Sequence, residues 1–239
     1  MKQPPKWFSA IFGETPFKKA IFRVDAGSKT GLSFGHASRC CTIAKLLYEI
    51  FGTDCLFLMY DYPEGLKYVA DRGWKIRIID KNTNIEKEQK IIMDQIKRDW
   101  PDWFIFDLPY LDQDLFYFQF IMNNETKILF IDDVRFCNPN ATVILNSSIH
   151  AKKNVSQQPG IKYLLGPDYF IFDPTFDDRS PYSSKYALNV LITFGGSDIS
   201  ELTFRVVNTL KKAQWGDIAF HVILGPGFKT PDSIYSTVK

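Results

Sequence analysis

Short apolar runs alternate with helically spaced segments along most of the chain. Runs of strand length occupy residues 20–25 (AIFRVD), 55–60 (CLFLMY), 75–79, 103–107 (WFIFD), 127–132 (KILFID) and 142–145. Continuous apolar runs of this length are typical of strands buried on both faces. Between them, apolar residues recur at helical spacing over residues 37–51, 63–72, 84–98 and 113–122. The alternation predicts βαβ units with right-handed crossovers, and therefore an α/β fold built on a parallel sheet.

The pattern starts again near the C-terminal end of the sequence. A strand, a helix and a strand are expected over residues 188–193, 201–212 and 218–224. The preceding segment is rich in proline, serine and charged residues, which is typical of a linker. The predicted organisation is an N-terminal extension at 1–19, a Rossmann-like domain at 20–172, a linker at 173–187 and a second Rossmann-like domain at 188–239. Two strands and one helix bury little core, so we expect this second domain to be incomplete.

Charge and hydropathy exclude several classes of protein. The 239 residues include 29 Lys and Arg against 27 Asp and Glu, a net charge of +2 that does not fit a non-specific nucleic-acid binder. No apolar run reaches the roughly 18 residues that span a bilayer, so we expect a cytoplasmic protein without stable membrane insertion. The basic, aromatic segment 1–19 lacks the features of a secretion signal, and we expect it to pack on its own domain.

The four cysteines do not form a recognisable metal or redox motif. Cys40, Cys41, Cys55 and Cys137 contain no CxxC pair and have no histidine at zinc-finger spacing. We expect reduced thiols in the core and no metal site.

A glycine-rich loop follows the first predicted strand. Residues 25–39 read DAGSKTGLSFGHASR, and a helix is expected to begin near His36. Backbone N–H groups at such a helix start favour an anion, and an uncharged imidazole there can act as a general base near pH 7. The alternative is that His36 simply bonds backbone at the helix terminus. The glycines match neither the GxGxxG nor the P-loop pattern.

A second glycine turn joins the strand and the helix of the C-terminal unit. Residues 193–202 read TFGGSDISEL, so Gly195, Gly196 and Ser197 offer donors that suit a diphosphate. The alternative is an ordinary turn in which Ser197 or Asp198 caps the helix.

Polar residues also follow other predicted strands, at the edge where parallel sheets bind ligands. Asp132 and Asp133 could bind metal or position a sugar, or could form a turn and a helix cap. Asn146 could contact substrate or satisfy a turn. The Asp112-Gln113-Asp114 triplet opens an amphipathic segment and favours capping over metal binding.

Four blocks together resemble the UDP-sugar hydrolases of pseudaminic acid biosynthesis (the PseG family), which are related to MurG-like glycosyltransferases of family 28. The blocks are VDAGSKTG with FGHASRC, FIFDLPYLD, FIDDVRFCNPNATVILNSS, and YLLGPDYFIFDPTF with VLITFGGSDISELT. The resemblance implies the two-domain GT-B fold and the release of UDP from a UDP-2,4-diacetamido-2,4,6-trideoxyhexose, with a UDP-sugar as substrate, a monomeric state and no cofactor. The family's second domain extends beyond the position of Lys239, which again implies an incomplete domain here.

The resemblance also assigns roles to residues. His36 is the expected catalytic base. The expected substrate-binding residues are Asp25, Gly35, Arg39, Asp107, Tyr110, Asp132, Asp133 and Asn146, and the expected diphosphate-binding residues are Gly195, Gly196, Ser197 and Asp198. Two alternatives stay open: a family 28-like glycosyltransferase, in which a sugar hydroxyl replaces water, and an inactive fragment that only binds sugar nucleotides.

Overall fold

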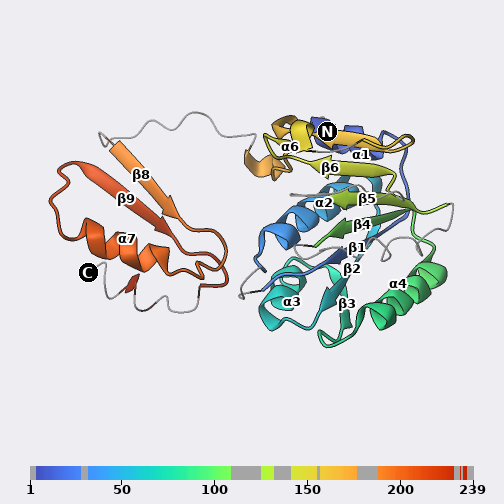
Figure 1. Cartoon of the computed structure of the whole chain (residues 1–239), viewed down its shortest axis with the longest axis horizontal. Coiled ribbons are helices and arrows are strands. Elements are labelled where there is room, and N and C mark those ends of the chain that lie inside the picture. Colours follow the sequence, from blue (N-terminus) through green and yellow to red (C-terminus); the bar gives the residue numbers. More distant parts are fainter. Residues whose placement is uncertain are drawn as a thin grey trace.

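The computed structural model describes residues 4–27, 32–108, 125–131, 141–154, 157–176, 188–228, 232 and 234–235. Within these ranges the chain forms a seven-stranded sheet and a separate two-stranded sheet (Figure 1). The strands of the larger sheet are β1 (Lys19–Val24), β2 (Asp54–Tyr60), β3 (Lys75–Ile79), β4 (Trp103–Asp107), β5 (Lys127–Ile131), β6 (Val143–Asn146) and β7 (Lys162–Leu165). The parallel α/β architecture predicted from the sequence is therefore confirmed.

The larger sheet is parallel throughout and runs in the order β3-β2-β1-β4-β5-β6-β7. The strand order reverses at β1, which pairs with β2 on one side and with β4 on the other. In doubly wound sheets, ligands bind beyond the carboxyl ends of the strands at such a reversal. The loop after β1 and the end of β4 therefore mark the expected ligand edge.

Helices cover both faces of this sheet. They are α1 (Lys6–Phe12), α2 (Gly35–Phe51), α3 (Pro63–Ala70), α4 (Ile85–Asp99) and the short α6 (Ala151–Asn154), with 3-10 turns η1 (Pro167–Tyr169) and η2 (Pro174–Phe176). Helices α1, α2 and α3 contribute to one apolar core. Helix α4 packs Ile92 and Ile96 into a second core on the opposite face.

The N-terminal segment packs on its own domain, as predicted. Trp7, Phe8, Ile11 and Phe12 of α1 are buried in the core that α2 lines. Phe8 lies 5.5 Å from Phe51, ring centroid to ring centroid, and so ties α1 to the last residue of α2.

Most predicted elements agree with the structure to within two residues. The strand β7 was missed, because its four residues precede a Gly-Pro turn and carry too little pattern. The helix predicted at 201–212 is shorter, spanning Leu202–Leu210, because the chain turns at Lys211. The helix predicted at 113–122 lies outside the described residues.

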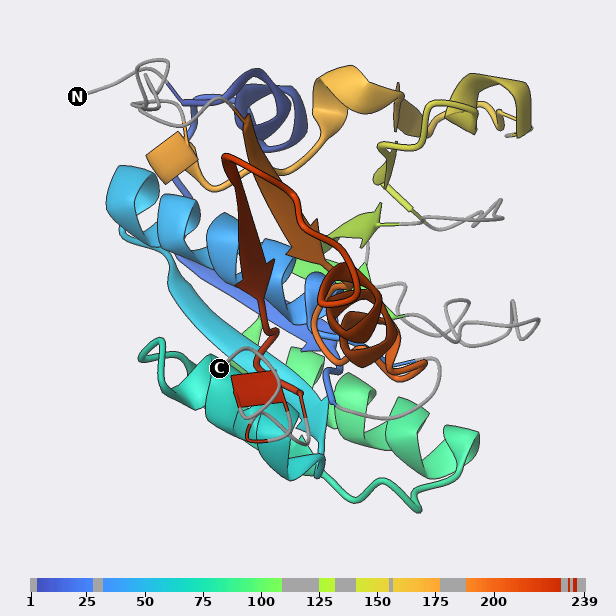
Figure 2. The ribbon, with the colours of Figure 1, turned by 90° about the vertical axis from the view of Figure 1, so that its left-hand side faces the viewer.

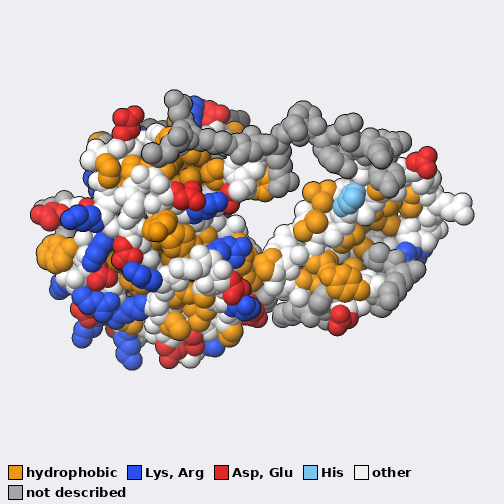
Figure 3. Space-filling model, turned by 180° about the vertical axis from the view of Figure 1, so that it is seen from behind, with side chains coloured by type: hydrophobic (Ala, Val, Ile, Leu, Met, Phe, Trp, Pro, Cys, Tyr) orange, Lys and Arg blue, Asp and Glu red, His pale blue; other side chains and the backbone are white. Residues whose placement is uncertain are grey.

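In residues 188–228, the C-terminal unit forms a two-stranded parallel sheet and one helix. It consists of β8 (Leu188–Thr193), α7 (Leu202–Leu210) and β9 (Ile218–Ile223). Leu191 and Ile223 are more than half exposed, and Figure 3 shows hydrophobic side chains gathered on this smaller unit. In Figure 2 this smaller unit is nearest the viewer, in front of the edge of the larger sheet at which α2 begins.

Candidate active site

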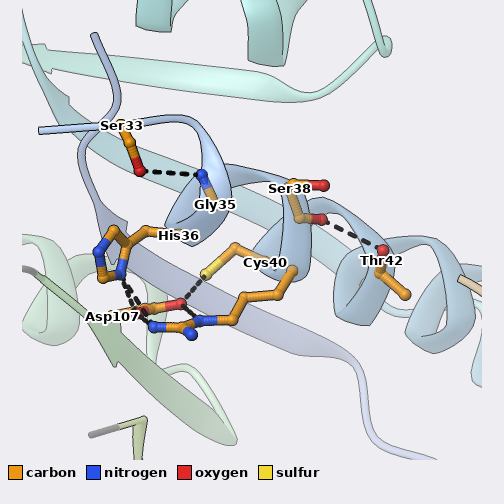
Figure 4. A network of polar contacts seen from close by, with 8 residues as sticks. Ser33, Gly35, His36, Ser38, Cys40, Thr42 and Asp107 are labelled. Carbon is orange, nitrogen blue, oxygen red and sulfur yellow. Dashed lines mark hydrogen bonds and ion pairs between the residues drawn. The ribbon is translucent and has the colours of Figure 1, made fainter. Parts of the chain in front are cut away.

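His36 and Asp107 meet at the reversal point of the sheet. His36 is the second residue of α2, which follows β1, and Asp107 is the last residue of β4. The His36 Nδ1 atom lies 2.6 Å from the Asp107 Oδ1 atom (Figure 4). The His36 side chain is 16% exposed, whereas that of Asp107 is fully buried. Solvent therefore reaches the imidazole but not the carboxylate behind it.

Arg39, one helical turn along α2, binds the same carboxylate. Its Nη2 atom donates to Asp107 Oδ1 at 2.6 Å, and its Nε atom donates to Oδ2. Burial alone would raise the pKa of Asp107, but the Arg39 guanidinium and then His36 outweigh burial and hold this pKa below its usual value. Asp107 is therefore an anion at neutral pH, fixed by a two-point contact.

An ionised Asp107 determines the tautomer of His36. A carboxylate only accepts hydrogen bonds, so we assign the ring proton to Nδ1. Arg39 Nη2 also lies 2.9 Å from Nδ1, but it donates to the shared carboxylate oxygen rather than to the ring. In the neutral form of the ring, the lone pair is then on Nε2. Such a ring, oriented from behind by a carboxylate, has the arrangement of a general base.

Asp25, which is expected to bind substrate, is part of a buried polar network. Its Oδ2 atom accepts a hydrogen bond from Arg23 Nη1 at 2.6 Å, and its Oδ1 atom accepts from the Tyr60 backbone N–H at 2.6 Å. Arg23 also donates to Glu88 of α4 at 2.6 Å, and both Arg23 and Asp25 are fully buried. The network ties the ends of β1 and β2 to α4, and so anchors the start of the glycine loop.

The structure describes some of the other expected substrate-binding residues and not others. Asn146 is 4% exposed and its Oδ1 atom accepts from the Ser148 N–H at 2.9 Å, which is the turn-forming alternative. Gly35 and Arg39 line a hollow described below. Tyr110, Asp132 and Asp133 lie outside the described residues.

In the C-terminal glycine turn, Asp198 caps α7. Its two carboxylate oxygens accept from the backbone N–H groups of Leu202, at 2.9 Å, and Thr203, at 2.8 Å. Burial would raise the pKa of Asp198, but these hydrogen bonds hold it below its usual value. The first N–H groups of α7 are thus already paired with an anion. The Gly195–Ser197 turn stays the expected contact for a diphosphate.

The two units touch through this turn. Ser197 Oγ lies 3.5 Å from the carbonyl oxygen of Gly27, and a Cβ atom added to Gly196 would lie 3.0 Å from the Phe34 ring. Close approach to Phe34 therefore favours glycine at position 196. The turn consequently faces the start of α2, next to His36.

Two hollows lie along α2, and the smaller of them opens at this junction. The larger, of about 750 Å³, runs along α2 and includes Gly35, Ser38, Arg39, Lys45 and Arg72 among its lining residues. The smaller, of about 420 Å³, is lined by Phe34, Gly35, Ser38, Tyr68, Arg72, Gly195, Gly196 and Pro226. His36 follows Gly35 in the sequence but is not among the described lining residues of either hollow. Tyr68 and Arg72 could not be predicted as lining residues from the sequence, because no motif marks an exposed helix end.

The described residues contain neither a candidate metal cluster nor a candidate membrane span. There, no group of three or more His, Cys, Asp or Glu side chains is arranged to hold a metal ion. In the same part of the chain, no helix has both the length and the apolar character needed to cross a bilayer.

Comparisons with known proteins agree with this fold. No protein-family model matches the chain. An uncharacterized protein of Methanocaldococcus jannaschii is 26% identical over 218 residues, which cover 87% of this chain and 43% of that protein. The spore coat polysaccharide biosynthesis protein SpsG of Bacillus subtilis is 24% identical over 187 residues, which cover 77% of this chain and 52% of that protein. The chain thus spans about half the length of the curated relatives it matches.

Among solved structures, the chain is similar to MurG of Acinetobacter baumannii. The TM-score is 0.54 at 16% sequence identity, and the match covers 92% of this chain and 70% of that MurG chain. A likeness at this identity concerns the fold alone. The protein therefore has a MurG-like, GT-B-type α/β fold.

Proposed function

We propose that this chain forms part of an enzyme that releases UDP from a UDP-diacetamido-trideoxyhexose. In this reaction His36 is the base that activates water. The observation that carries the proposal is the His36–Asp107 pair, in which a buried carboxylate holds Nδ1 and leaves Nε2 to accept a proton. The MurG-like fold and the likeness to a polysaccharide biosynthesis protein support a nucleotide-sugar substrate. The choice of UDP and of this sugar rests on the four sequence blocks that resemble the pseudaminic acid hydrolases.

The reaction follows from the position of the base. His36 Nε2 takes a proton from water while the water oxygen bonds to the anomeric carbon of the sugar. The bond between that carbon and the β-phosphate oxygen breaks, and UDP leaves with the bonding electron pair. Direct displacement inverts the anomeric configuration. Backbone donors of the Gly195–Ser197 turn stabilise the negative charge on the departing diphosphate.

A glycosyltransferase is the second candidate, because the same base could activate a sugar hydroxyl. The MurG-like fold favours this reading as strongly as the hydrolytic one. The two functions differ in a single observable, which is UDP release in the absence of any acceptor sugar.

The test is incubation of the UDP-sugar in ¹⁸O-labelled water without an acceptor. We expect UDP release, with ¹⁸O at C1 of the sugar and none in UDP. Label in the phosphate would mean attack at phosphorus and would exclude the proposed displacement at carbon. No release without an acceptor, but release when a sugar acceptor is added, would favour the transferase.

A further inference from the structure

Arg72 is placed in the junction between the two units. It follows α3 in the turn before Gly73, and its side chain lines both hollows. In the smaller hollow the opposite wall consists of Gly195, Gly196 and Pro226 of the C-terminal unit. A cation from one unit therefore faces a glycine turn from the other.

The Arg72 guanidinium is held in position without being neutralised. Its Cζ atom lies 3.5 Å from the centroid of the Tyr68 ring, and Nη1 donates to the Tyr68 carbonyl oxygen at 2.8 Å. In the described part of the chain, no carboxylate forms an ion pair with Arg72. By contrast, Lys67 of α3 pairs with Asp71 at 2.9 Å. Arg72 thus keeps its charge and further N–H donors for a ligand.

The charge balance of the smaller hollow points to an anion. Its described lining contains no Asp or Glu, and Arg72 is its one cation among those residues. Arg39, which lines only the larger hollow, is already bound to Asp107. The N-terminus of α7 is occupied by Asp198, so it cannot neutralise a ligand at the glycine turn. A diphosphate at this turn needs a cation from the other wall.

We propose that Arg72 is a phosphate-binding residue and that a diphosphate lies between its guanidinium and the Gly195–Gly196 turn. Arginine suits this role, because its planar fork donates two parallel hydrogen bonds to phosphate oxygens. Tyr68 would act as the positioning residue, since its ring and carbonyl oxygen fix the guanidinium. The inference deepens the proposed function and rests on it for the identity of the nucleotide, but not for the phosphate chemistry.

The test is calorimetric titration of the 239-residue chain with pyrophosphate, UDP and uridine. The variants are Arg72→Gln and Arg72→Lys, with Lys67→Gln as the matched control, which removes the same charge from α3 outside both hollows. We expect Arg72→Gln to weaken UDP and pyrophosphate binding about ten- to hundredfold, with uridine unchanged. Arg72→Lys should recover part of the loss, and Lys67→Gln should bind as the wild type does. Equal melting temperatures establish that each variant is folded.

The outcomes separate the two proposals. Arg72-dependent binding of pyrophosphate without preference for UDP would leave the phosphate site standing and contradict the uridine nucleotide. UDP binding that is unchanged in Arg72→Gln would overturn the role of Arg72 and leave the proposed function intact. Binding of neither anion by the wild type would overturn the phosphate site in this chain.

Discussion

Asp107 is the residue on which the site depends, because it contacts both His36 and Arg39. Its carboxylate is completely buried, its charge is offset by the Arg39 guanidinium, and it also contacts His36 Nδ1 and Cys40 Sγ. A buried charge is stable only while its hydrogen bonds are made, so the three side chains act as one unit. The strand-end position of Asp107 was predictable from the sequence. Its role behind His36 was not, because it depends on the parallel pairing of β1 with β4.

Replacement of Asp107 by Asn should therefore damage both stability and activity. We expect Asp107→Asn to lower the free energy of unfolding by about 3–5 kcal/mol, because Arg39 loses its buried partner. UDP release should fall at least about a hundredfold, because an amide can stabilise the wrong tautomer of His36. Urea unfolding and initial rates measure the two effects. The control is Asp71→Asn, which breaks an exposed pair with Lys67 and should cost less than about 1 kcal/mol.

The stability of this unit should depend on pH in the acid range. Because the folded-state pKa of Asp107 lies below its usual value, the ionised carboxylate stabilises the fold at pH values above the ordinary carboxyl pKa. That stability is lost as the pH falls through the lowered pKa. The urea midpoint of the wild type should drop between about pH 4 and the onset of acid unfolding, and the difference from Asp107→Asn should shrink. A difference that stays constant down to acid unfolding would contradict an ionised Asp107.

The buried thiols should be inert in the native protein. Burial raises the pKa of Cys55 to about 12, with the charge of Asp54 adding to the effect, and burial likewise raises that of Cys41 to about 12. At pH 8 the thiolate fraction is then about a thousandfold lower than for an ordinary thiol. Iodoacetamide labelling, followed by peptide mass spectrometry, should modify both residues rapidly only in urea. Labelling of Cys55 at equal rates in native and unfolded protein would contradict its burial.

At the scale of elements, α1 shows what the hydrophobic pattern of a helix can and cannot predict. Its aromatic residues indicated packing on the domain, and Phe8 is indeed fully buried between Phe12 and Phe51. The pattern did not identify Phe51 as the partner, since that contact depends on where α2 ends. Strand β7 carried too few residues to be recognised, although β6 needs it as a neighbour.

Truncation of Phe8 should release α1 from the sheet. We expect Phe8→Ala to lower the free energy of unfolding by about 3–5 kcal/mol, through lost burial and an unfilled cavity. Ser9→Ala, at the adjacent exposed position of the same helix, should change it by less than about 0.5 kcal/mol. Urea midpoints measure both variants. A small effect of Phe8→Ala would mean that α1 does not contribute to the core.

At the scale of the whole molecule, the site is assembled where the two units meet. The carboxyl edge of the large sheet supplies His36 and Asp107, the turn between α3 and β3 supplies Arg72, and the small sheet supplies the glycine turn. Sequence patterns identified both glycine segments, because strand, glycine turn and helix form a local signal. They could not identify Arg72, whose significance depends on the packing of one unit against the other. Nor could they decide that Asp198 caps α7, since the capping and phosphate-binding readings fit the same residues.

The most direct test of the account is the rate of UDP release, without an acceptor, by the wild type and by His36→Ala at saturating UDP-sugar. The matched control is His150→Ala, at an exposed turn that is not part of the site. Loss of a general base typically costs about 10²- to 10⁴-fold, so His36→Ala should lose at least that range while His150→Ala keeps the wild-type rate. Equal rates for wild type and His36→Ala would contradict the assignment of His36 as the base.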